Sequence, residues 1–222
     1  MAVATHAPRR HDRFLVAIVA VAVGLAVADS SVVVLALPDL YGTFDVSIVG
    51  VSWTITAYNI AIVVGALAVL PFERRVRGHV FAGVGLGVFA AASLVCGFAN
   101  AFELLIAGRV VQGIGAALAL AGSVPVLAGI LGSEARALAV WGFAGSIGVA
   151  AGPALGGVLT QLFSWRSIFL LQAPIGALAL IAVADRRARQ AGIAERRDRV
   201  SRTFLANVGF LLLYGALVGA LF

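Results

Sequence analysis

Two ionisable residues lie inside long apolar stretches: Asp29 in GLAVADSSVVV and Arg109 in LLIAGRVVQG. A charged side chain near the middle of a bilayer costs at least about 2.5 kcal/mol on insertion scales, and such residues commonly mark ion pathways and proton relays. The proton affinity of a carboxylate changes with its desolvation and with a nearby cation. Opening and closing a cavity around these two residues would therefore bind and release a proton. The alternatives are a static buried pair, or an Asp29 that caps a helix kink with Ser30 and Ser31.

The composition is that of a membrane protein. Of the 222 residues, 62% are hydrophobic and only 12% are charged, whereas an ordinary soluble domain is about 25% charged. All 16 basic residues are arginines. They lie between apolar runs, so the formal charge of +6 indicates membrane topology and not nucleic-acid binding. A lone Cys96 and three histidines without metal-ligand spacing predict no metal, no cofactor and no catalytic cluster.

Seven apolar runs are long enough to cross a bilayer core, which needs about 20 helical residues. The letters AVA before Asp29 imitate a signal-peptidase site, but the apolar run resumes directly as VVVLALP, which favours a retained first helix. Connections such as PDLYGTFDVS and ANAFE are short, so successive helices should be antiparallel neighbours. The expected spans are 14–37, 51–72, 79–99, 104–131, 138–163, 167–184 and 204–222.

The arginines also predict an orientation, because loops kept in the cytoplasm carry an excess of positive residues. With the amino terminus in the cytoplasm, 14 of the 16 arginines lie on that side. The outer connections then carry the acids Asp39, Asp45 and Glu103, together with Arg166. We therefore expect a multi-pass protein of the bacterial cell (inner) membrane with a cytoplasmic amino terminus.

In this topology Asp29 and Arg109 lie in the outer halves of the first and fourth spans. At a rise of about 1.5 Å per residue, their depths differ by roughly 5 Å. We expect them to share one polar pocket. Other candidates for its lining, each of which could instead be an interhelical hydrogen-bond partner, are Gln112, Tyr58, Asn59 and Gln172.

The fifth span is rich in glycine, which lowers helix stability in water. At about 100° per residue, five glycines fall within an arc of about 120°: Gly142, Gly145, Gly148, Gly152 and Gly156. Faces of small residues let helix backbones approach closely in lipid, so a close helix contact is predicted here. Pro153 removes one backbone donor and is expected to bend this helix.

The string GVAAGPALGG in this span resembles the antiporter signature of the major facilitator superfamily, which lies in the fifth helix of its drug:proton export branch. The motif positions are Gly148, Gly152, Pro153, Gly156 and Gly157. ADSSVVVLALPDL resembles the branch's first-helix pattern, with Val34 in place of the usual asparagine. GRVVQGIGAA is similar to its fourth-helix pattern, and FSWRSIFLLQAPIG to the opening of its sixth helix. These motifs cover nearly the whole chain in the family's order.

The resemblance implies roles for particular residues. In this family the first and fourth helices line a central cavity, and an acid and an arginine there couple proton entry to substrate release. These roles correspond to Asp29 and Arg109, with Gln112 beside them. The family's loop motif after the second helix corresponds to VLPFERRVR, which keeps its acid and bases as Glu73, Arg74 and Arg77 but lacks its glycines. A plain cytoplasmic loop that obeys the positive-inside rule is the alternative.

We therefore predict an all-α polytopic membrane protein: a six-helix bundle of the major facilitator type plus the first helix of a second half. The predicted function is a transmembrane transporter, with proton-coupled efflux of small molecules or drugs by alternating access. Its partners would be membrane lipid, protons and a small-molecule substrate. A membrane-embedded enzyme would need clustered histidine, aspartate or serine within the spans, which the sequence lacks.

The expected organisation is a cytoplasmic tail (1–13), the six-helix bundle (14–184), a basic cytoplasmic linker (185–203) and a seventh helix (204–222). Family members place their transport path between two six-helix halves. We therefore expect this chain to be a partial transporter that needs a missing second half or a second copy. The alternative is a non-transporting truncated membrane protein, or a half-transporter that needs a partner.

Overall fold

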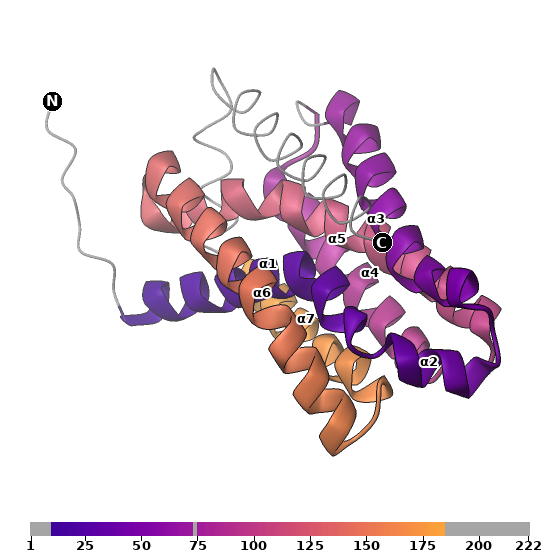
Figure 1. Ribbon diagram of the computed structural model, residues 1–222. Helices are drawn as coiled ribbons and strands as arrows, with labels where there is room; N and C mark the ends of the chain where they lie inside the picture. The colour runs from indigo at the N-terminus through magenta and orange to yellow at the C-terminus, as the bar shows by residue number, and fades with distance from the viewer. Residues whose placement is uncertain (1–9, 73–74, 185–222) are drawn as a thin grey trace, which may run out of the picture.

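The computed structural model describes residues 10–72 and 75–184, and this part of the chain is a bundle of helices (Figure 1). The predicted seventh helix and basic linker lie outside the described residues. The helices are α1 (Arg10–Val34), α2 (Leu37–Phe44), α3 (Ile48–Val69), α4 (Gly78–Gly97), α5 (Phe102–Leu131), α6 (Glu134–Leu162) and α7 (Arg166–Ala184), with a short 3₁₀ turn, η1 (Leu70–Phe72), after α3.

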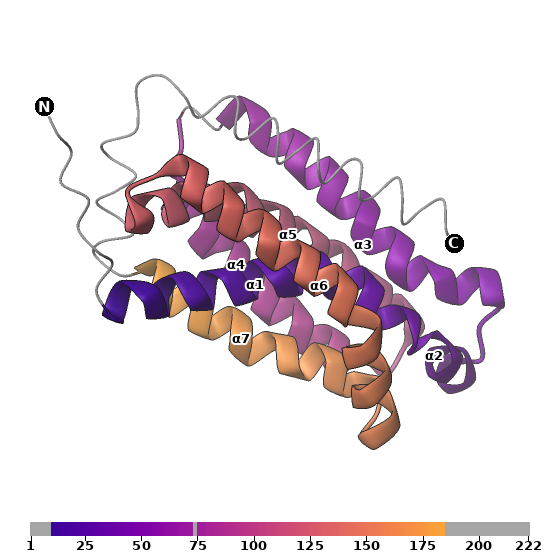
Figure 2. The same cartoon turned by 60° about the vertical axis from the view of Figure 1, so that its left-hand side comes forward.

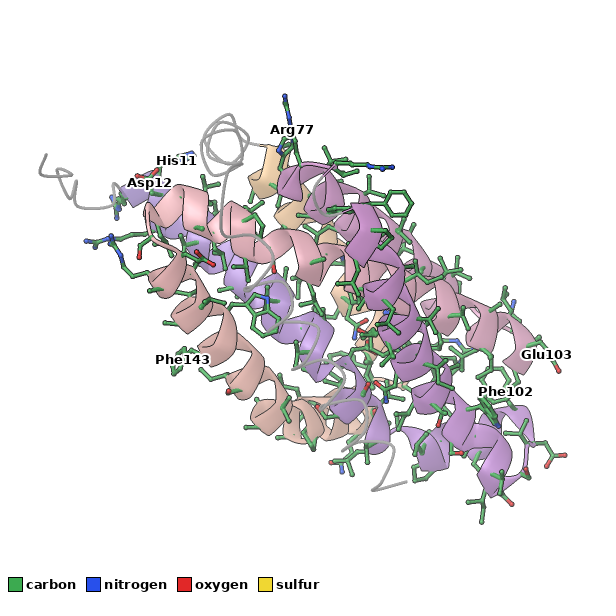
Figure 3. All side chains as sticks on the ribbon, turned by 90° about the horizontal axis from the view of Figure 1, so that it is seen from above. His11, Asp12, Arg77, Phe102, Glu103 and Phe143 are labelled. Carbon is green, nitrogen blue, oxygen red and sulfur yellow. The ribbon has the colours of Figure 1, made fainter. Side chains whose placement is uncertain are left out.

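Six of the described helices are long and apolar enough to cross a membrane: α1, α3 with its 3₁₀ turn, α4, α5, α6 and α7. Large apolar side chains cover the outside of the bundle, as expected where lipid replaces water. Phe143 on α6, for example, is 70% exposed and points away from the other helices (Figure 3). The fold-class prediction of an all-α polytopic membrane protein is confirmed.

Helix α5 lies at the centre of the bundle. It packs on α3, α4, α6 and α1, while α1 packs mainly on α6 and α7 packs mainly on α4. In Figure 2, α3 and α7 lie on opposite flanks, with α1 and α6 side by side between them. A residue on α5 can therefore contact several helices at once.

Close backbone approach explains why α5 packs so tightly on α4. A Cβ added to Gly115 would lie 2.6 Å from the backbone nitrogen of Phe89, and one added to Gly85 would overlap the backbone of Ala119. Without a hydrophobic driving force between helices in lipid, such small-residue contacts supply the dispersion energy of association. Glycine at these positions brings α5 and its polar side chains against α4.

The first connection differs from the sequence-based expectation. The first span was expected to continue to residue 37, with PDLYGTFDVS as a loop, but α1 ends at Val34 and most of this stretch forms α2. Pro38 lacks the N–H that would extend the α1 ladder, yet it suits the first turn of a new helix. Helix α2 ends at Phe44, and its C-cap residue Asp45 adopts the left-handed conformation with φ of 50°. The connection between α1 and α3 therefore contains a short helix.

Side chains cap the starts of two spans. The Ser47 hydroxyl accepts a hydrogen bond from the Gly50 amide at 2.9 Å at the start of α3, and the Ser133 hydroxyl accepts one from the Arg136 amide at 3.4 Å at the start of α6. These bonds satisfy amides that have no partner within the helix. Both helices therefore begin at their caps, a few residues before the starts at 51 and 138 that were expected from hydropathy.

Candidate functional site

Asp29 of α1 and Arg109 of α5 form an ion pair inside the bundle. Arg109 Nη1 contacts Asp29 Oδ2, and both side chains are 0% exposed. The sequence-based expectation that the two residues share one polar pocket agrees with this contact. Removing two charges from solvent is costly unless they are paired and hydrogen-bonded, so the other contacts of the pair matter.

The guanidinium of Arg109 is held on several sides. Its Nε donates to the backbone carbonyl of Thr54 on α3 at 2.8 Å, and its Nη1 donates to Gln112 Oε1 at 2.7 Å. Its carbon lies 4.2 Å from the centroid of the Tyr58 ring and 5.5 Å from that of the Phe169 ring. A planar, weakly hydrated guanidinium suits such an aromatic site better than an ammonium would.

Two buried glutamines complete a ring of hydrogen bonds around the pair. Gln172 of α7 donates from Nε2 to Asp29 Oδ1 at 2.6 Å. Gln112 of α5 donates from Nε2 to Gln172 Oε1 at 2.7 Å and to the hydroxyl of Ser93 on α4 at 2.8 Å. The ring therefore joins α1, α5 and α7, with α4 attached to it.

The residues beside Asp29 have other partners. The Ser30 hydroxyl donates to Asn59 Oδ1 at 2.7 Å, and the Ser31 hydroxyl donates to the Ala28 carbonyl at 2.7 Å. The Tyr58 hydroxyl donates to the Ala26 carbonyl at 2.7 Å. Asn59 and Tyr58, considered as lining candidates from the sequence, thus bond to the Asp29 segment of α1, while Asp29 itself faces Arg109.

Three buried polar atoms at this site make no hydrogen bond in the described structure: Arg109 Nη2, Thr54 Oγ1 and Asp29 Oδ2, the last of which is ion-paired with Arg109. An unsatisfied buried donor costs about 1 to 3 kcal/mol. The pair and its ring therefore form a polar cluster that is not fully satisfied.

Sequence reasoning missed three contributors to this site: Thr54, Ser93 and Phe169. Thr54 acts through its backbone carbonyl, so its residue type carries no signal. Ser93 occurs in an apolar run as an isolated hydroxyl, and Phe169 looks like an ordinary core residue. Only the position of α7 against α4 and α1, which brings the Phe169 ring to Arg109, reveals why Phe169 matters.

The glycine face of α6 lies against α1. A Cβ at Gly148 would overlap the Gly24 carbonyl, one at Gly156 would overlap the Val32 carbonyl, and one at Gly152 would overlap the Ser31 hydroxyl. A Cβ at Gly157 would lie 2.9 Å from Leu35 Cδ1. The motif glycines therefore set the contact between α6 and the helix that carries Asp29.

Pro153 lies inside α6 (Glu134–Leu162), and the bend expected at this residue stays a prediction. One detail of the glycine-rich span differs from the expectation. Gly142 falls on the same arc, but a Cβ there would meet nothing within 4 Å. The close contact therefore begins near Gly145, whose added Cβ would lie 3.8 Å from Val27.

Of the predicted loop motif, Glu73 and Arg74 lie outside the described residues. Arg77 is exposed and occupies the N-cap position of α4, where its carbonyl accepts from the Val80 amide at 2.9 Å. The pairing of acid and arginines in this motif stays a prediction. No group of three potential metal ligands occurs among the described residues.

The chain is similar to known membrane transport proteins. The sequence model of the Major Facilitator Superfamily matches residues 19–222. The chain is 36% identical to a methylenomycin A resistance protein of Bacillus subtilis over 191 residues, which are 84% of this chain and 41% of the relative. It is 34% identical to a lincomycin resistance protein of Streptomyces lincolnensis, covering 81% of this chain and 38% of that protein.

Similarity also extends to the multidrug resistance protein Stp of Mycobacterium tuberculosis, at 31% identity over 93% of this chain and 38% of the relative. The chain thus spans about two fifths of the length of the curated relatives it matches. A crystal structure of a bacterial homologue of the human lysosomal transporter Spinster, inward-facing and unoccupied, shares the fold. Its TM-score is 0.62 at 15% identity, covering 80% of this chain and 43% of that one.

Proposed function

Because the chain belongs to the Major Facilitator Superfamily, we propose that it forms part of a transmembrane transporter that exports small molecules in exchange for protons. The observation that carries this proposal is the fully buried ion pair between Asp29 on the first membrane span and Arg109 on the fourth. A titratable carboxylate beside a fixed cation is the minimal device for taking up and releasing one proton. The identified relatives include proteins named for resistance to methylenomycin A and lincomycin.

The proposed mechanism alternates between two states of Asp29. While the carboxylate is ionised it pairs with Arg109, as in the structure. Protonation of Asp29 would remove the attraction and free the guanidinium for another partner. Because α1 and α5 both contact α6 and each other, a change in the pair would alter the packing of these helices. Alternating access couples such a change to exposure of a cavity on one side or the other.

We further propose that the amino terminus lies in the cytoplasm and that transport uses a second helical half, since alternating access of this type moves two halves around one site. The bundle would supply one wall of the path. Reconstitution of the purified 222-residue chain tests this directly. Drug uptake by that chain alone would indicate that two copies assemble the path, whereas no uptake favours the alternative of a half-transporter that needs a partner.

The experiment for proton coupling uses inside-out bacterial vesicles containing a transporter that carries this sequence. The vesicle lumen is acidified by respiration, and lincomycin or methylenomycin A is added while a pH-sensitive acridine dye reports proton release. Asp29→Asn should abolish the drug-dependent signal, because the amide cannot titrate. The matched control is Asp39→Asn on the exposed surface of α2, which should keep the signal. Normal drug-dependent proton release by Asp29→Asn would refute Asp29 as the coupling acid.

A further inference from the structure

Helix α7 reaches the ion pair through one amide side chain. We propose that Gln172 is a positioning residue for Asp29. It donates a hydrogen bond to the carboxylate and connects it, through Gln112, to Arg109, in addition to the direct ion pair. Through this bond, α7 responds to the protonation state of Asp29. This inference rests on the proposed function, since it assigns the machinery of the same proton site. Gln172 is 1% exposed, so the contact is not shared with solvent.

The hydrogen bonds of the ring all run in one direction, from the cation to the anion. Arg109 donates to Gln112, Gln112 donates to Gln172, and Gln172 donates to Asp29. Each glutamine therefore accepts with its oxygen on the side of Arg109 and donates with its nitrogen on the side of Asp29. Rotating either amide by a half turn would place donor against donor at one end and acceptor against acceptor at the other. The network thus has one satisfied orientation.

That orientation suits an ionised Asp29. A proton bound at Asp29 Oδ1 would face the Nε2 donor of Gln172, so that two donors would point at each other. Gln172 would then have to turn its amide or withdraw. Turning it would break its bond with Gln112, because Gln172 Oε1 is the acceptor for Gln112 Nε2. Proton uptake at α1 is in this way transmitted to α7 and back to α5.

A second contact links α7 to the pair. Phe169 lies one turn before Gln172, and its ring centroid is 5.5 Å from the guanidinium carbon of Arg109. Phe169 in turn stacks edge-on with Trp165, at 6.2 Å between ring centroids. Helix α7 therefore contacts both members of the pair, the acid through an amide and the base through a ring.

Few other ionisable groups face Asp29. Arg109 from α5 is paired with it, and Tyr58 from α3 lies over the guanidinium. From α4, the Cys96 thiol lies 3.8 Å from Gln112 Oε1. The charged residues of the remaining neighbours, α6 and α7, lie in their first turns: Glu134, Arg136 and Arg166. Titration at the ring is therefore expected to report Asp29.

The test is infrared difference spectroscopy on the 222-residue chain in lipid, titrated with pH. The carboxylate bands of Asp29 are identified by their loss in Asp29→Asn. In Gln172→Met, which keeps the volume and removes the donor, these bands should move, because the carboxylate loses the hydrogen bond from Gln172 Nε2. Gln161→Met is the matched control, because Gln161 is exposed on α6 and should leave the bands unchanged.

A second variant, with a shorter amide side chain at position 172, keeps the test valid if Gln172→Met does not fold. Gln172→Asn keeps the polarity but shortens the reach by one methylene, so it should move the same bands in a stable protein. In vesicles with a transporter carrying this sequence, both variants should reduce drug-dependent proton release about tenfold, the loss expected for a hydrogen bond to a charged group. Gln161→Met should not reduce it.

The outcomes separate the inference from the function on which it rests. Bands that stay unmoved in both Gln172 variants overturn the positioning role, whatever transport does. Moved bands with unreduced proton release, while Asp29→Asn abolishes release, overturn the role but leave the proposed function standing. Unchanged proton release in Asp29→Asn removes the proposed function and the inference together. Moved bands with reduced release in the Gln172 variants, and neither effect in Gln161→Met, support the proposal.

Discussion

The guanidinium carbon of Arg109 lies 4.2 Å from the centroid of the Tyr58 ring, inside a bundle where neither side chain contacts solvent. The Tyr58 hydroxyl also donates to the Ala26 carbonyl on α1 at 2.7 Å. One side chain of α3 thus touches both helices of the ion pair, by its ring on one side and its hydroxyl on the other. The two contacts can be separated by substitution.

Replacing the aromatic ring of Tyr58 should lower the stability of the bundle more than removing its hydroxyl. Tyr58→Leu loses the cation–π contact, worth about 2 kcal/mol when desolvated, as well as the hydrogen bond, whereas Tyr58→Phe loses only a bond worth about 1 kcal/mol. Thermal unfolding in detergent, followed by circular dichroism, should therefore rank wild type above Tyr58→Phe and Tyr58→Phe above Tyr58→Leu. Equal loss in the two variants would show that the ring does not support Arg109.

The ion pair should show strong coupling in a double-mutant cycle. Arg109→Gln alone leaves Asp29 as an unpaired buried charge, which costs about 3 to 5 kcal/mol when a buried pair is broken. Adding Asp29→Asn removes that charge, so the double variant should recover much of the stability. The same thermal measurement checks this. A double variant less stable than Arg109→Gln would mean that the two residues do not depend on each other.

Because α6 contacts α1 closely, alanine substitutions at different glycines of the same α6 face should lower the stability of the bundle by different amounts. Gly148→Ala should destabilise the bundle by about 1 to 3 kcal/mol, the usual range for overpacking, because its Cβ would overlap the Gly24 carbonyl. Gly142→Ala is the matched control on the same helix, since its Cβ meets nothing within 4 Å. Alanine has the higher helix propensity, so Gly142→Ala should not destabilise the helix. If the control loses as much stability as Gly148→Ala, the contact with α1 does not explain the loss.

The sequence could predict the ion pair because a few simple features determine how deep the two residues lie in the membrane. Two charges in apolar runs, a rise of about 1.5 Å per residue and the alternation of helix direction place Asp29 and Arg109 at similar depths. Family motifs added the neighbouring Gln112. The spacing of the glycines likewise indicated a close contact along α6, although it could not name α1 as the partner.

The remaining features depend on how the helices pack, which the sequence does not encode locally. Gln172 was a candidate for the pocket lining, but its bond to Asp29 could not be predicted, because it depends on α7 lying against α1 and α4. Gly142 shares the arc of the other glycines, but a Cβ added there would meet no atom within 4 Å. Helix α2 was not predicted, because PDLYGTFDVS was identified only as a short connection between apolar runs, although its proline suits a first helical turn.

The orientation of the bundle can be tested at the two ends of α4. Arg77 precedes this helix and Glu103 lies in the first turn of α5, just after it, so about 20 residues of helix separate the two positions by roughly 30 Å. Both side chains are exposed, and Glu103 lies at the opposite end of the bundle from His11 in the first turn of α1 (Figure 3). In a Cys96→Ala background, an impermeant maleimide on intact cells should label Glu103→Cys but not Arg77→Cys, because the positive-inside rule places the arginine-rich end in the cytoplasm.

Inside-out vesicles should give the reverse pattern, which controls for reactivity, and Cys96→Ala alone should stay unlabelled. Labelling of Arg77→Cys in intact cells would invert the topology and place the Asp29 pair in the inner half of the membrane.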